Sequence, residues 1–165
     1  MPLSDVRTAD AVRWESLLLS GPGEELHIRV FQAGPAPGGW LVWAHGGSWR
    51  SGSVAGWHSA CADLARTADA TVVGVDYRLA PDHPHPAALE DVLTAMDWAQ
   101  QQSETPIAVG GDSAGGTIAA SAALIWRDRQ RPLAAQVLAY PPMDPACRAQ
   151  SFRRNPEMFP SRAGL

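Results

Sequence analysis

One serine in this sequence stands where it could act as a nucleophile. Ser113 is the centre of Gly111-Asp-Ser-Ala-Gly115, which follows the apolar run 107–109 and precedes a run of small residues. The apolar run predicts a buried strand and the small residues predict a helix, so the pattern is G-x-S-x-G at a strand-to-helix turn. Flanking glycines leave room for such a strained turn. The alternative interpretation is a Gly-Ser turn that only joins a strand to a helix.

Backbone N–H groups near this serine could receive a substrate oxygen. The stretch His45-Gly-Gly-Ser-Trp49 follows the apolar run 40–44, and its glycines leave N–H groups uncovered by side chains. The start of the helix after Ser113 adds further N–H groups and the positive end of the helix dipole. Donors placed in this way stabilise an oxyanion in acyl transfer. The other interpretation is a tight glycine turn, with His45 packed as a scaffold residue.

Two more polar stretches come directly after predicted strands. The first, residues 76–86, reads Asp-Tyr-Arg-Leu-Ala-Pro-Asp-His-Pro-His-Pro. We expect Asp76 and Arg78 to fix this loop and the prolines to fix the entry to the next helix. The second, residues 140–144, ends in Asp144. Aspartate is a common turn residue, so capping of a loop is the first interpretation of Asp144 and a role in the site is the second.

The elements that must position these residues alternate along the chain. Residues 12–19 and 26–31 predict an antiparallel pair of strands. Buried strands are then predicted at 40–44, 70–75, 107–109 and 135–140, with helices between them over 57–68, 86–96 and 118–125. This order predicts an α/β fold, a mainly parallel sheet with helices on both faces. We expect one domain over residues 1–165, with the serine strand near the centre of the sheet.

Composition and charge exclude several classes of function. The 165 residues carry a net charge of −4, and 45% are hydrophobic and 18% charged, as in folded globular proteins. The only basic cluster is Arg153-Arg154, which argues against a nucleic-acid partner. No apolar run approaches the ~20 residues of a membrane span. The N-terminus lacks a secretory-signal pattern, and Cys61 and Cys147 form no metal-ligand pattern. We therefore expect free thiols, a cytoplasmic location and no metal or other cofactor.

Four stretches together resemble one protein family. HGGSW, DYRLAPDHPHPAALEDV, GGDSAGG and YPPMD are similar to the hormone-sensitive-lipase-like branch of the α/β-hydrolases, over about residues 26–147 and in the family's order. The resemblance implies the α/β-hydrolase fold and hydrolysis of small-molecule carboxylic esters. It also implies Ser113 as nucleophile and an oxyanion hole formed by the N–H groups of Gly46, Gly47 and Ala114. Ser48 is a departure, because the family usually has a third glycine there.

The family's catalytic order of nucleophile, acid and histidine is not completed here. All five histidines precede Ser113, the family's last strands have no counterpart, and its N-terminal cap helices are reduced to the first ten residues or so. We interpret the chain as the N-terminal portion of an esterase, either a truncated gene product or a fragment. Without a base, a serine hydroxyl is a poor nucleophile. Two functions stay open: an ester hydrolase impaired in this chain, or an inactive hydrolase or acyl-ester-binding module.

Two further expectations follow from the missing strands. No histidine of this chain should complete a triad with Ser113. The last predicted strand, 135–140, should form an apolar sheet edge without a neighbour, which favours pairing with another chain. We therefore expect self-association through this edge.

Overall fold

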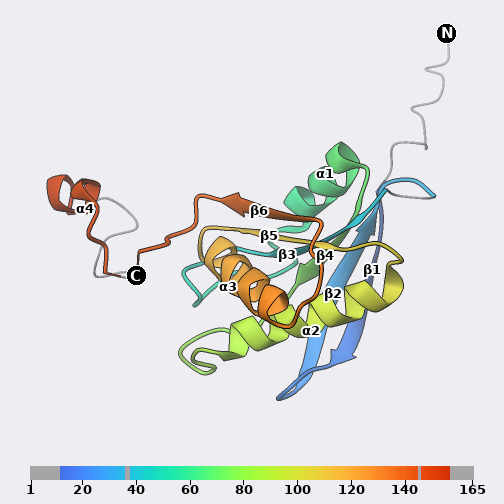
Figure 1. The fold of residues 1–165 in the computed structure, drawn as a ribbon, viewed down its shortest axis with the longest axis horizontal. Helices are drawn as coiled ribbons and strands as arrows, with labels where there is room; N and C mark the ends of the chain where they lie inside the picture. Colours follow the sequence, from blue (N-terminus) through green and yellow to red (C-terminus); the bar gives the residue numbers. More distant parts are fainter. Residues whose placement is uncertain (1–11, 36–37, 145, 157–165) are drawn as a thin grey trace, which may run out of the picture.

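A computed structural model describes residues 12–35, 38–144 and 146–156 (Figure 1). Its strands are β1 (Arg13–Ser20), β2 (Glu25–Gln32), β3 (Trp40–Ala44), β4 (Thr71–Val75), β5 (Ala108–Asp112) and β6 (Ala135–Ala139). Its helices are α1 (His58–Ala68), α2 (Ala87–Gln102), α3 (Ala114–Asp128) and α4 (Gln150–Arg154). From β3 to β6, strands and helices alternate, as the hydrophobic pattern predicts.

The strands form one mixed sheet in the order β1-β2-β4-β3-β5-β6. β1 and β2 are an antiparallel pair, β2 joins β4 antiparallel, and the remaining neighbours are parallel. This confirms the predicted α/β fold class and its antiparallel hairpin. The expected central position of the serine strand is wrong, because β6 alone lies beyond β5 among the described strands.

Helices cover both faces of the sheet (Figure 1). α1 packs against β2 and β4 on one face, and α2 and α3 pack together on the other. Successive residues of β3 point to opposite faces, so Leu41 and Trp43 join the apolar cluster under α1 while Val42 and Ala44 join the one under α2 and α3. Burial on both faces explains why these strands read as continuous apolar runs.

The prediction of a buried strand at 135–140 is wrong in its burial, because β6 lies at an edge of the sheet and is poorly covered. Its first three residues, 135–137, are exposed, and Val137 leaves 41% of its surface open. β5 pairs with one side of β6, and no described strand pairs with the other. Among the described residues, β6 is thus a sheet edge that carries an exposed apolar side chain.

Three structural observations concern the helices, the cysteines and the metal-ligating side chains. None of the helices within the described ranges is long and apolar enough to cross a membrane. Cys61 and Cys147 are free and buried, and burial, with the nearby Asp112 charge, raises the pKa of the Cys61 thiol to about 12. The described part of the chain gathers no group of three or more metal-ligating side chains.

Candidate active site

Ser113 lies at the sharp turn from β5 to α3. Its φ is +50° and its ψ is −121°, a combination that a residue with a side chain rarely adopts. The Ser113 N–H donates to the carbonyl of Ala139 at 2.8 Å, which fixes the turn to the end of β6. Gly115, one residue into α3, lies so close to the carbonyl of Ala44 that a Cβ there would overlap it. The serine is therefore held, half-buried, at the carboxyl edge of the sheet.

The loop after β3 runs directly against this turn. A Cβ built on Gly46 would lie 3.3 Å from the Ser113 Cβ. Gly47 has a φ of +126°, a conformation that favours glycine, and its carbonyl accepts hydrogen bonds from the N–H groups of Arg50 and Ser51, both at 3.0 Å. β3 and β5 are parallel neighbours in the sheet, so the segments that follow them meet at the same edge. The HGGSW loop therefore reaches the serine, although more than sixty residues separate them.

Two backbone donors, one in the HGGSW loop and one at the start of α3, have no partner within the described structure. Neither the Gly47 N–H nor the Ala114 N–H donates a backbone hydrogen bond to a described residue. Ala114 is the first residue of α3, where an N–H has no acceptor inside the helix. The structure therefore places the Gly46 backbone against Ser113 and Ala114 directly after it, with Gly47 as the residue that follows Gly46. The role of Gly46, Gly47 and Ala114 as an oxyanion hole remains a prediction.

His45 is buried under the glycine loop and is hydrogen-bonded to it. Its Nδ1 lies 2.7 Å from the Gly46 carbonyl oxygen, and because that oxygen can only accept, Nδ1 carries the proton. The ring stacks on Tyr77 with centroids 4.3 Å apart, and the Tyr77 hydroxyl donates to the His45 carbonyl at 2.7 Å. Burial lowers the pKa of His45, so the imidazole is neutral at pH 7. These contacts give His45 a scaffold role.

Asp112 is a buried residue of this site that the sequence analysis missed. Its Oδ1 accepts hydrogen bonds from the indole Nε1 of Trp57 at 2.9 Å and of Trp43 at 3.3 Å. The helical spacing predicts a helix over 57–68 and gives no polar role to Trp57. The one available signal was Asp112 itself, because a carboxylate at the end of a buried strand needs polar partners.

The other four histidines make contacts elsewhere. His27 is exposed on β2. The Nδ1 of His58 lies 3.0 Å from an Arg29 guanidinium nitrogen, and the Nε2 of His83 lies 3.4 Å from a Glu24 carboxylate oxygen. His85 lines a hollow beside α2 and α3. No described hydrogen bond joins the Ser113 hydroxyl to a histidine.

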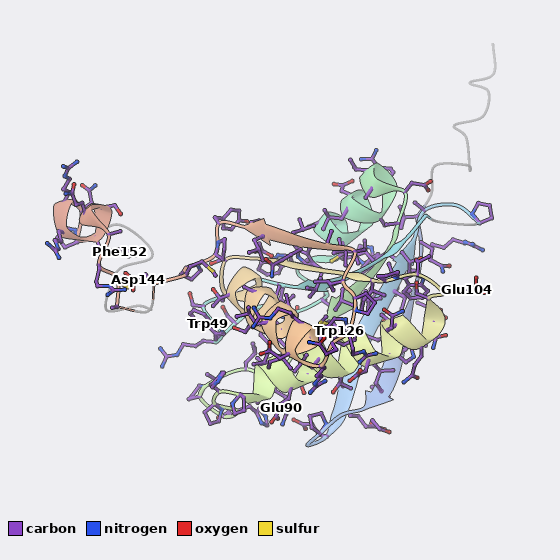
Figure 2. All side chains as sticks on the ribbon, in the orientation of Figure 1. Trp49, Glu90, Glu104, Trp126, Asp144 and Phe152 are labelled. Carbon is purple, nitrogen blue, oxygen red and sulfur yellow. The ribbon has the colours of Figure 1, made fainter. Side chains whose placement is uncertain are left out.

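Asp144 and Arg78 have structural partners. Asp144, labelled in Figure 2, lies on the segment beyond β6. Its carboxylate accepts hydrogen bonds from the N–H groups of Arg148 and Ala146 and so caps the turn there. The Arg148 N–H is the main reason why the pKa of Asp144 lies below its usual range. Arg78 forms a two-pronged ion pair with Asp91 on α2, with N–O distances of 2.9 Å. The loop 76–86 is thereby attached to α2.

Residues 41–163 match the family described as having the alpha/beta hydrolase fold. The chain belongs to that family. Carboxylic ester hydrolase LipN of Mycobacterium tuberculosis is 39% identical over 125 residues, which are 70% of this chain and 33% of LipN. Esterase LipI of the same organism is 38% identical over 141 residues, 79% of this chain and 44% of LipI. These relatives support the hormone-sensitive-lipase-like branch of the family.

Solved esterase structures share the architecture. A hyperthermophilic esterase from the archaeon Pyrobaculum calidifontis superposes with a TM-score of 0.83 at 36% identity, over 88% of this chain and 50% of the esterase. An arylesterase superposes with a TM-score of 0.85 at 27% identity, over 96% of this chain and 58% of the arylesterase. The chain therefore spans between a third and somewhat more than half of the length of these four proteins.

Proposed function

We propose that this chain carries the nucleophile and the oxyanion hole of a serine carboxylic ester hydrolase. The observation that supports this most is the backbone of Ser113, held at a φ of +50° between β5 and α3 with the Gly46 backbone against its side chain. This arrangement presents one hydroxyl beside uncommitted N–H donors, which acyl transfer requires. The named relatives that are ester hydrolases support the same reaction class.

In the proposed reaction, the Ser113 oxygen attacks the carbonyl carbon of the ester. The hydroxyl proton passes to a base, and the carbonyl oxygen becomes an oxyanion that the N–H groups of Gly46, Gly47 and Ala114 stabilise. When the tetrahedral intermediate collapses, the bond to the alcohol oxygen breaks and the alcohol leaves with a proton. The acyl group remains as an ester of Ser113, and attack by water then breaks that ester and releases the acyl group as a carboxylic acid.

In our proposal, this chain does not provide the base for the reaction. His45 is bonded to Gly46, and the partners of His58 and His83 are Arg29 and Glu24. The base and its orienting acid would come from outside these 165 residues. Enzymes that lose triad members retain a residual ~10³–10⁴-fold acceleration over water through binding and the oxyanion hole. We also propose a cytoplasmic location for the protein.

Added imidazole tests the proposal because it can replace a missing base. The purified chain is mixed with p-nitrophenyl acetate at increasing imidazole concentrations, and intact mass spectrometry follows acetylation. We expect an imidazole-dependent rate above that of imidazole alone, with the acetyl group on Ser113. Ser113→Ala should abolish this excess, whereas Ser59→Ala, an exposed serine on α1, should retain it.

An inactive hydrolase that only binds acyl esters is the second candidate. It is favoured by the absence of any described hydrogen bond between Ser113 and a histidine. If the imidazole-dependent excess is the same in the wild type and in Ser113→Ala, the ester hydrolase proposal is wrong. Saturation of ester binding under those conditions would then support the binding module.

A further inference from the structure

Two hollows lie side by side along the first turns of α3. The first, of about 340 Å³, lies between α3 and the loop that leads into α2. The second, of about 290 Å³, lies between α3 and the segment that follows β6. Both are lined by the same three residues, Trp49, Thr117 and Ser121. Each is close in size to the smaller ligand pockets of proteins, which begin at about 300 Å³.

Trp49 is fixed where the two hollows meet. Ser48 and Trp49 both have left-handed backbones, with φ values of +51° and +60°. The Trp49 carbonyl accepts a hydrogen bond from the Ala80 N–H at 2.8 Å, which ties it to the loop beside the first hollow. Figure 2 shows Trp49 next to α3. The half-buried Trp49 side chain also packs against the apolar cluster under α2 and α3, so it forms a wall between the hollows.

Both hollows begin one helical turn from the candidate nucleophile. The Thr117 N–H donates to the Ser113 carbonyl at 3.2 Å, and the Thr117 hydroxyl donates to the Pro142 carbonyl at 3.0 Å. The second bond joins α3 to the segment that closes the second hollow. On the other side, Trp49 is only two residues beyond Gly47. An ester carbonyl held at Ser113 would therefore lie near the boundary between the hollows.

We propose that Trp49 is a specificity-determining residue that separates the two arms of the substrate. This rests on the proposed ester hydrolysis at Ser113. The carbonyl carbon of an ester bears an acyl arm and an alcohol arm that diverge, and each hollow takes one of them. Apolar side chains line both places, with Leu89 and Ile118 in the first hollow and Leu124 and Met143 in the second. The preferred substrates are esters with apolar chains on both sides of the carbonyl.

Isomeric ketones test this division without any catalytic step. 6-Undecanone has two five-carbon arms, whereas 2-undecanone has a single nine-carbon arm, and the two share one composition. Dissociation constants come from ligand-observed NMR titration of the intact chain. The wild type should bind 6-undecanone about tenfold more tightly, because filling both hollows should bury about two more methylenes than filling one. Trp49→Ala should bring the ratio close to one, and Trp49→Phe should preserve most of it.

Matched variants identify the source of a negative result. Leu124→Trp partly fills the second hollow from an exposed position, so it should weaken 6-undecanone binding more than 2-undecanone binding. Trp14→Ala, on β1, should leave both constants unchanged. Ser113→Ala should keep the ketone preference, which separates this test from the failure of ester hydrolysis.

Two results would overturn the division by Trp49. One is equal binding of the two ketones by the wild type, and the other is a preference that persists in a folded Trp49→Ala. If thermal melting shows that Trp49→Ala does not fold, the wild-type ratio and Leu124→Trp decide the question. In that case, a Leu124→Trp variant that weakens both ketones equally would contradict the proposal.

Discussion

The indole N–H of Trp57 donates to the carboxylate of Asp112 across 2.9 Å. This bond joins the segment that leads into α1 to the residue directly before Ser113. Asp112 is 7% exposed, and its Oδ1 has a second donor in the indole of Trp43 on β3. The orientation of the serine turn therefore depends not only on its own glycines but also on Trp43 and Trp57, which lie on the face of the sheet that α1 covers.

Replacing Trp57 by phenylalanine should destabilise the fold. The change keeps an aromatic ring but removes the shorter of the two indole bonds to Asp112, and a hydrogen bond to a charged group contributes about 1.5–3 kcal/mol. We expect a loss of about 2 kcal/mol in the free energy of unfolding, measured by urea denaturation. Trp98→Phe is the control, because the Trp98 indole N–H has no described partner. Equal losses in both variants would contradict a role for the Asp112 bond.

Much of the fold could be predicted because its signals are local. Each buried strand is a short apolar run, and the glycines next to Ser113 indicate the turn there. The Trp57–Asp112 bond could not be predicted, because it spans 55 positions and no sequence spacing relates an indole to a carboxylate. The position of Trp49 between the two hollows could not be predicted for the same reason, because its neighbours Ala80 and Thr117 come from separate elements.

The central position expected for β5 failed for a different reason. The number of strands beyond a given strand is a property of the whole sheet, and the apolar run at 107–109 carries no information about it. The loop residues Asp76 and Arg78, in contrast, have the structural partners expected of them. The Val54 N–H donates to Asp76 at 2.9 Å, and Arg78 binds Asp91.

Breaking the ion pair between Arg78 and Asp91 should be costly. Asp91 is 1% exposed, so Arg78→Met leaves a buried carboxylate whose one remaining donor among the described residues is the N–H of residue 78. We expect a loss of about 3 kcal/mol in unfolding free energy, measured by urea denaturation. Arg78→Lys should be intermediate, because an ammonium cannot reproduce the two-pronged contact.

Two further variants test the cause of that loss. Adding Asp91→Asn to Arg78→Met removes the uncompensated charge and should recover part of the stability. Arg127→Met breaks an exposed pair with Asp128, whose side chains are 68% and 66% exposed, and should change stability by no more than about 0.5 kcal/mol. A double variant as unstable as Arg78→Met would show that lost packing, rather than the buried charge, dominates.

The buried His45 should make stability depend on pH. Its pKa is lowered in the folded protein, so below the ordinary value of about 6.5 the unfolded chain binds more protons than the native one. Stability should therefore fall as the pH falls from 7.5 through 6.5 toward the lowered pKa. Urea denaturation at pH 7.5 and 5.5 should show a smaller difference for His45→Gln than for the wild type. His27→Gln, at an exposed position, should retain the wild-type difference, and identical pH dependence in all three proteins would contradict this account.

The exposed edge at β6 should make the chain self-associate. One side of β6 pairs with β5, the other has no described neighbour, and Val137 is 41% exposed. A charged side chain on an edge strand discourages such pairing, so Val137→Lys should lower the weight-average mass in sedimentation equilibrium at a fixed concentration. The opposite edge offers a matched control, because Leu18 on β1 is 52% exposed. If Leu18→Lys lowers the mass and Val137→Lys does not, the chains pair through β1. If neither variant changes a mass above that of the monomer, association does not use the sheet edges, and a monomeric wild type excludes this prediction altogether.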